Sequence, residues 1–152
     1  MKKAGVGMED GERIAAAAGG GGGGGNLFSD LPSGQHPGTA EGEAAGAEII
    51  QALLTAPGLT IERIVSTGQA SLPGHWYDQA WAEWVLVLSG EAGLLLEGEA
   101  APRHLIAGDY LEIPPHRRHR IVWTAAGRPT LWLAVHHGAV PQEGSAGPPD
   151  VL

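Results

Sequence analysis

The chain has 152 residues, no cysteine and a formal net charge of −8, from 17 acidic and 9 basic residues. This length suits one compact domain. The lack of cysteine excludes disulfides and thiolate metal sites, and the acidic balance with no basic stripe argues against nucleic acid as a partner. No apolar run of 18 residues occurs, which argues against a membrane partner. We therefore expect a soluble, cytoplasmic protein.

The N-terminal third of the chain has the composition of a flexible tail. It contains the run 19-GGGGGGG-25 and further Gly, Ala, Ser and Pro. A glycine run loses more backbone entropy on ordering than its few apolar neighbours can offset. The composition predicts a disordered tail over 1–45, a folded domain over 46–138 and a second flexible tail over 139–152.

The folded part is predicted to begin with a short helix and to continue as strands. In residues 46–55 the side chains of Ile49, Ile50, Leu53 and Leu54 have helical spacing, and 57-PG-58 ends the pattern. After this point β-branched and aromatic residues alternate with glycine-containing turns. Strands are predicted at 59–68, 83–89, 94–97, 103–107, 109–113, 117–124 and 130–136. This pattern is typical of an all-β sandwich or small barrel.

Two of these strands are apolar on both faces. In 84-WVLVL-88 the alternation places Trp84, Leu86 and Leu88 on one face of the strand and Val85 and Val87 on the other. A strand of this kind needs cover on both sides. In a domain of about 90 residues a second subunit supplies that cover most simply, so the sequence predicts a homodimer.

Two stretches resemble the motifs of the cupin superfamily. In 83-EWVLVLSG-90 a Glu precedes a Gly by seven positions, as in the second half of the first cupin motif. In 108-GDYLEIPPHRRH-119 the residues Gly108, Pro114 and His119 have the spacing of the second motif, with His116 where the family usually has Gly. The chain therefore looks like a small single-domain bacterial cupin. The resemblance implies a double-stranded β-helix, or jelly-roll, barrel.

The resemblance also implies a divalent metal inside the barrel. Of the family's ligands, the Glu and the second-motif His carry over to Glu83 and His119. The family's His-x-His pair falls on Trp76 and Asp78, or on Tyr77 and Gln79, depending on the gap that is counted. The expected ligands are Glu83 and His119, with Asp78 and Gln79 as further oxygen donors. Such a set would suit Mn, Fe, Ni or Zn.

Strand alternation supports an interior position for the same two residues. In 117-RRHRIVW-123 His119 lies on the apolar face, and Glu83 shares its face with Val85 and Val87. A buried carboxylate and a buried imidazole are unfavourable alone, but are tolerated as a pair or as ligands of a cation. The alternatives are a surface position for Glu83, a hydrogen-bonded core histidine for His119 and a loop-capping role for Asp78. His136 and His137 are predicted to be a solvated strand end.

Two functions remain open from the sequence. In one, the metal site serves an enzyme acting on a small organic molecule, with Tyr77 as the candidate catalytic proton donor. In the other, the barrel is a metal-free module that binds or senses a small molecule without turnover. The cupin fold hosts many chemistries, so the fold alone selects neither function.

Overall fold

The computed structural model describes residues 24–32 and 48–138 of the chain. Eight strands and no helix form in this part. They are β1 (Ile49–Ala56), β2 (Leu59–Ser66), β3 (Ala82–Ser89), β4 (Glu91–Leu96), β5 (Arg103–Ile106), β6 (Tyr110–Ile113), β7 (His119–Thr124) and β8 (Thr130–His137). Within the two described stretches, no helix has the length and apolar character that a membrane span requires. The remainder of both predicted tails lies outside the described residues.

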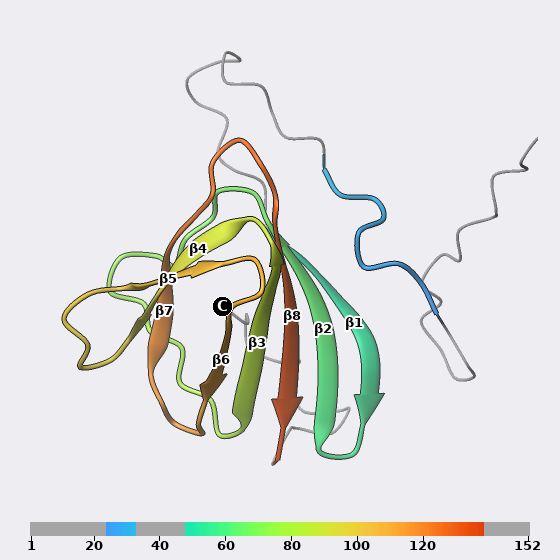
Figure 1. Ribbon diagram of the computed structural model, residues 1–152. Coiled ribbons are helices and arrows are strands. Elements are labelled where there is room, and N and C mark those ends of the chain that lie inside the picture. The colour runs from blue at the N-terminus through green and yellow to red at the C-terminus, as the bar shows by residue number, and fades with distance from the viewer. Residues whose placement is uncertain (1–23, 33–47, 139–152) are drawn as a thin grey trace, which may run out of the picture.

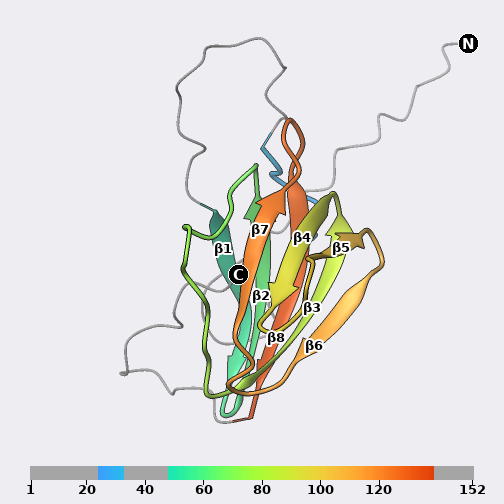
Figure 2. The same cartoon turned by 90° about the vertical axis from the view of Figure 1, so that its left-hand side faces the viewer.

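The strands form two antiparallel sheets. One sheet has five strands in the order β1-β2-β8-β3-β6, and the other has three in the order β5-β4-β7. Figure 1 shows β3, β8, β2 and β1 running side by side, and Figure 2 shows β4, β5 and β7 as a second layer. This arrangement is the jelly-roll that the sequence predicted, and the strand from 59 onward agrees with β2.

The core lies between the two sheets. Val85 and Val87 of β3 meet Leu94 of β4 and Ile121 of β7, and all four side chains are buried. Trp132 of β8 is the largest fully buried side chain. Because strand side chains alternate between faces, every second residue of β3, β7 and β8 is committed to this interior. The same alternation directs Glu83, His119 and His136 inward.

The predicted N-terminal helix is wrong: residues 49–56 form the edge strand β1. The four apolar residues behind the prediction, Ile49, Ile50, Leu53 and Leu54, are all 39% to 48% exposed. A short helix depends on burying its apolar stripe, and here no such burial occurs. Pairing with β2 satisfies the backbone instead. A register shift between Ala52 and Leu54 inserts Leu53 as an extra residue, which breaks the alternation expected of a strand.

The turn between β3 and β4 depends on Gly90. Its φ is +81°, a left-handed conformation that glycine adopts without strain. A Cβ at this position would lie 2.6 Å from the Cα of Thr130 and 2.7 Å from the carbonyl oxygen of Pro129. Both contacts are to backbone, so a rotamer change cannot relieve them. Gly90 therefore fixes how closely the β3–β4 turn approaches the start of β8.

Replacing Gly90 with alanine should destabilise the fold more than the same change at Gly98. Gly98 has a similar φ of +87° but open space around the added Cβ. Gly98→Ala should cost about 1–2 kcal/mol from the backbone conformation alone. Gly90→Ala should cost a further ~1–3 kcal/mol from overpacking. Urea denaturation of both variants measures the difference, and equal losses would show that the contact with Thr130 carries no energy.

A buried arginine ties residues 24–32 to the five-stranded sheet. The side chain of Arg63 on β2 is 7% exposed, and its guanidinium donates to the carbonyl oxygens of Leu27 at 2.8 Å and Ser29 at 2.5 Å. It also donates to Oε1 of Gln51 on β1 at 3.2 Å. These residues fall inside the stretch predicted as a tail, so part of that stretch has a defined position. The predicted division of the chain into tail, barrel and tail otherwise stays a prediction.

Removal of residues 1–32 should lower the stability of the chain through Arg63. The truncation leaves a buried guanidinium without two acceptors, which should cost about 1.5–3 kcal/mol. In an Arg63→Met background the same truncation should cost at least ~1 kcal/mol less, because the charge is gone. The free energies of unfolding of the four proteins form a double-mutant cycle. Additive losses would mean that the segment and Arg63 do not act together.

The outward side chains of β3 and β8 form the apolar face for which the sequence predicted cover by a second subunit. Trp84, Leu86, Leu133 and Val135 point away from the core and are half-buried in a single chain. Trp84 packs against the exposed Tyr110 of β6, with ring centroids 5.7 Å apart. The chain thus carries an apolar and aromatic surface on the outside of the five-stranded sheet, and the homodimer stays a prediction.

Candidate functional site

Glu83 and His119 meet inside the barrel. Glu83 is the second residue of β3, and His119 is the first residue of β7 in the opposite sheet. Oε2 of Glu83 lies 3.5 Å from Nε2 of His119, and both residues are 0% exposed. The structure therefore brings together the two residues that the cupin motifs single out, and it excludes a surface position for Glu83.

The hydrogen bond of His119 determines which form of the ring is present. Its Nδ1 lies 3.1 Å from the carbonyl oxygen of Arg117, and a carbonyl can only accept, so Nδ1 carries the proton. In a neutral ring Nε2 then has a lone pair, and this lone pair faces Glu83. Nε2 of His119 and both carboxylate oxygens of Glu83 are buried without a hydrogen-bond partner. Two electron-pair donors thus face each other across 3.5 Å.

This arrangement places two hydrogen-bond acceptors against each other with no donor between them among the described residues. A buried carboxylate without hydrogen bonds is strongly unfavourable, and so is an imidazole nitrogen held against it. A second proton on His119 would make an ion pair, and a cation between them would be bound by both. A shared proton or a bound cation would satisfy both groups.

A second buried carboxylate–imidazole pair lies in the same end of the barrel. Nε2 of His136 on β8 is 3.3 Å from Oε2 of Glu62 on β2, and the indole N–H of Trp81 donates to Nδ1 of His136 at 3.1 Å. His136 is 1% exposed and Glu62 is 3% exposed. An indole nitrogen only donates, so Nδ1 of His136 bears a lone pair and Nε2 bears the proton. His136 is therefore a neutral imidazole that donates to Glu62.

The prediction that His136 and His137 form a solvated strand end is wrong for His136: it is buried in this second pair, and only His137 is exposed. Strand alternation could have predicted the interior position of His136. It shares one face of β8 with Trp132 and Ala134, which are both apolar. Glu62 could have been found in the same way from Ile64, two residues further along β2.

Strand register connects the two pairs. Glu83 of β3 lies directly opposite His136 of β8, so both side chains project to the same side of the sheet. Two carboxylates, Glu62 and Glu83, are thus buried near one end of the interior. His136 is held neutral by Trp81 and balances neither charge. His119 is the one described imidazole that faces Glu83 with an unpartnered nitrogen.

The other predicted site residues have different positions. Asp78 is at the surface, where its carboxylate lies 2.9 Å from Nδ1 of His116. Gln79 is 4% exposed, and its amide nitrogen is buried without a hydrogen-bond partner. Tyr77 pairs with His119 through its backbone, and the two rings have centroids 5.6 Å apart. Of these three residues, Tyr77 is the one shown in contact with the Glu83–His119 pair.

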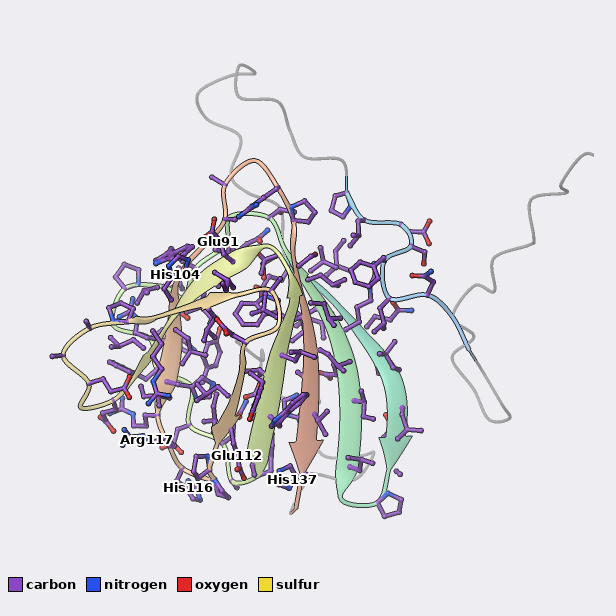
Figure 3. The ribbon with its side chains drawn as sticks, viewed as in Figure 1. Glu91, His104, Glu112, His116, Arg117 and His137 are labelled. Atoms are coloured by element: carbon purple, nitrogen blue, oxygen red, sulfur yellow. The ribbon has the colours of Figure 1, made fainter. Side chains whose placement is uncertain are left out.

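Four charged or titratable side chains lie at the end of the barrel where this site is found. Figure 3 shows Glu112, His116, Arg117 and His137 along the edge where β8 ends and β7 begins. His116 has a φ of +59°, a left-handed conformation that explains why cupins usually place Gly there. His116, Arg117 and His137 are exposed. Together with the exposed Glu112, and with Asp78 paired to His116, they form a rim of mixed charge at this end of the barrel.

Among residues 24–32 and 48–138, no three His, Asp or Glu side chains are grouped closely enough to hold a metal ion. The described arrangement therefore offers two donors of suitable kind, the Glu83 carboxylate and Nε2 of His119. Their chemistry fits a borderline divalent cation, since the set combines an oxygen and an imidazole nitrogen. Both are buried and have no hydrogen-bond partner, as the ligands of an ion would be before the ion binds.

A separate ionic cluster lies on the outside of the three-stranded sheet (Figure 3). Glu91 of β4 binds Nε2 of His104 at 2.7 Å and the guanidinium of Arg128 at 2.5 Å. Hydrogen bonds from His104 first, and then from Arg128, hold the pKa of the Glu91 carboxyl below its usual value. The cluster is exposed to solvent and makes no contact with the interior site. It provides a surface counterpart of the Glu83–His119 pair.

Replacing His104 with alanine should raise the pKa of Glu91 toward its ordinary value, because the largest cause of the lowering is removed. A lowered folded pKa gives stability above the unfolded pKa of the carboxyl, which is lost as the pH falls through the folded pKa. On acidification, His104→Ala should therefore lose the stability contributed by the Glu91 carboxylate at a higher pH than wild type does. An NMR titration of the Glu91 carboxyl carbon measures the shift, with His137→Ala as the control. An unchanged titration in His104→Ala would contradict the assignment.

Comparison with known proteins defines the family. The family model described as "Cupin domain" matches residues 62–136, the stretch that contains both residues of the site. A proposed mannose-6-phosphate isomerase from Ralstonia eutropha JMP134 is 53% identical, with a TM-score of 0.66, and the match covers 76% of this chain and 97% of that one. The chain belongs to the cupin superfamily.

More distant structures share the fold. A cupin superfamily protein from Desulfitobacterium hafniense DCB-2 is 17% identical with a TM-score of 0.51, covering 70% of this chain and 96% of that one. A DMSP lyase from Ruegeria pomeroyi DSS-3 is 24% identical with a TM-score of 0.50, covering 72% and 58% respectively. No curated protein matches the chain. At these identities the likeness concerns the jelly-roll alone.

Proposed function

We propose that this cupin binds one divalent cation between Glu83 and His119 and uses it to act on a small organic molecule. The observation that supports the proposal is the facing pair of buried, unpartnered donors 3.5 Å apart. Nδ1 of His119 donates to a backbone carbonyl, which fixes the ring as metal-binding histidines are fixed. A bound Mn, Fe, Ni or Zn ion would serve as a Lewis acid toward a substrate oxygen.

The substrate class follows from the 53% identical relative. That protein is named as a proposed mannose-6-phosphate isomerase, so the reaction would interconvert the aldose and ketose forms of a phosphorylated sugar. Such a substrate offers a carbonyl and neighbouring hydroxyl to the buried site and a phosphate to its surroundings. In support, Arg117 at the rim provides a cationic group for a phosphate. Under this proposal Tyr77, whose ring centroid lies 5.6 Å from that of His119, donates a proton to a substrate oxygen.

Access to the site depends on the segment before β3. Backbone hydrogen bonds join Tyr77 to His119 at 2.8 and 3.1 Å, and the N–H of His116 donates to the carbonyl oxygen of Gln79 at 2.6 Å. These bonds hold the segment around 75–81 against the start of β7, and Glu83 is 0% exposed. Under this proposal a movement of that segment admits the small molecule.

The alternative function is a metal-free binding module. One observation favours it: only two donors of the described residues face each other, whereas a tightly held cation usually has three or more protein ligands. In this case His119 takes a second proton and forms an ion pair with Glu83. The rim and Tyr77 would then bind an anionic small molecule without turnover.

Metal analysis separates the two functions. Protein purified without chelators and without a nickel column should contain close to one Mn, Fe, Ni or Zn ion per chain by elemental analysis. Glu83→Gln and His119→Ala should each weaken binding at least ~10-fold, since even partners outside the ligand shell commonly contribute that much. Glu91→Gln and His104→Ala, which alter the surface Glu–His pair, should have no effect and serve as controls.

The metal content of the same variants also shows when the proposal is wrong. Metal content equal to wild type in both Glu83→Gln and His119→Ala would show that the ion lies elsewhere. Wild-type protein that takes up none of the four metals on titration would favour the metal-free module. Circular dichroism of each variant shows whether the fold is intact, so that loss of metal is not confused with loss of structure.

A further inference from the structure

We infer that Trp76, which lies between Arg118 and Arg120 on the outside of the barrel, is a latch that keeps the strap, residues 75–81, closed against β7. The inference rests on the proposed function, because that function takes the same segment as the entry to the buried site. It concerns side chains that point away from the interior, and none of them belongs to the proposed cation site.

The strap is attached to the barrel at both ends. Before it, the N–H of Ser71 donates to the carbonyl oxygen of Ile121 at 2.8 Å, and the N–H of Ile121 donates to Oγ of Ser71 at 2.9 Å. At its far end Trp81 is buried, with 6% of its surface exposed. Between these anchors Gly74 has a φ of +77° and open space around it, so the backbone can turn there without a clash. The middle of the strap can therefore lift while its ends stay in place.

The middle of the strap presents successive residues to opposite sides of β7. Tyr77 pairs with the buried His119 through its backbone, and the two rings have centroids 5.6 Å apart. Because side chains alternate along an extended chain, the neighbours of this pair point to the outer side. Trp76 therefore meets Arg118 and Arg120, the residues on either side of His119.

Two guanidinium groups flank the indole of Trp76. The guanidinium carbons of Arg118 and Arg120 lie 5.7 and 5.8 Å from the centroid of the ring. A cation at this distance is attracted to the face of an indole. Arg118 is also held by Glu97, whose carboxylate accepts from its guanidinium at 2.6 Å. The outer face thus holds the strap by a side chain, in addition to the backbone bonds between Tyr77 and β7.

The position of Arg120 makes this latch one that can open. Its Nε is buried and has no hydrogen-bond partner in the described residues. A buried donor without an acceptor is unfavourable, so the closed position of Arg120 depends on its contact with the Trp76 ring. When Trp76 moves outward, water can reach Nε, which offsets part of the attraction that is lost. The latch therefore holds the strap closed without sealing it.

Removing either side of the latch should increase local opening of the strap. Trp76→Leu and Arg120→Met should each speed exchange of the Tyr77 and His119 amide protons about 2- to 30-fold, the equivalent of one cation–π contact. Both protons are bonded between the strap and β7, so NMR of their exchange with solvent measures the opening. Trp76→Tyr, which keeps an aromatic face, should retain most of the protection.

Two substitutions on the outside of the three-stranded sheet are matched controls. Trp123→Leu removes another indole, whose ring centroid lies 5.1 Å from that of His104. Arg103→Met removes another guanidinium, which pairs with Glu99 at 2.5 Å. These contacts are made with β5 and with the turn before it, so neither control should change the exchange of the two amide protons in the strap contact.

The pattern of exchange separates a latch from a general contribution to stability. Faster exchange at the strap, with unchanged exchange in β3 and β4 and an unchanged urea midpoint, supports the latch. Equal acceleration at the strap and in the core strands would show that Trp76 and Arg120 only stabilise the whole fold, and would overturn it. Unchanged exchange in both variants would overturn it as well. Should Trp76→Leu fail to fold, Arg120→Met decides the matter.

The kinetics of cation binding connect the latch to the proposed site. Arg120→Met should speed both uptake and release of Co²⁺ by the same factor and leave the affinity unchanged, because opening precedes both steps. A changed affinity would place Arg120 in the binding site and contradict its role as a latch. If the wild-type chain binds no Co²⁺, the proposed cation site fails, whereas amide exchange still supports or overturns the latch.

Discussion

The central feature of the barrel interior is a pair of buried carboxyl groups, Glu62 and Glu83, with no basic Lys or Arg partner among the described residues. Both are buried near one end of the core, and no Lys or Arg side chain of the described residues is hydrogen-bonded to them. One carboxylate is supported by a neutral imidazole, and the other has no hydrogen-bond partner at all. A fold selected only for stability would replace such groups by apolar side chains of similar size. Their presence is the basis of the proposed cation site at this end of the barrel.

The strands and the central pair could be predicted from the sequence because both depend on local patterns. Alternation along β3 and β7 fixes which side chains enter the core, and it placed Glu83 and His119 correctly. The second pair needed the register between β2, β8 and β3, which no single strand reveals. Asp78 and Gln79 lie in an irregular segment where alternation gives no guidance, and the structure separates them, one exposed and one buried.

The first strand shows how tertiary context overrides a local pattern. Residues 49–56 have the spacing of an amphipathic helix, but the deciding factors are the available edge of β2 and the tight turn at 57–58. The extra residue at Leu53 produces a spacing that imitates a helix. Periodicity alone cannot distinguish a bulged strand from one or two helical turns, because the two patterns differ only where the bulge falls.

An edge strand with these side chains has a consequence for how the protein behaves at high concentration. Eight consecutive residues of β1 include neither a charge nor a proline, and among the described strands only β2 pairs with their backbone, on one side. Such an edge is a template for strand addition by another chain. The irregularity at Leu53 interrupts the row of donors and acceptors, so the feature that misleads sequence reading is also the feature within β1 that opposes self-association into longer sheets.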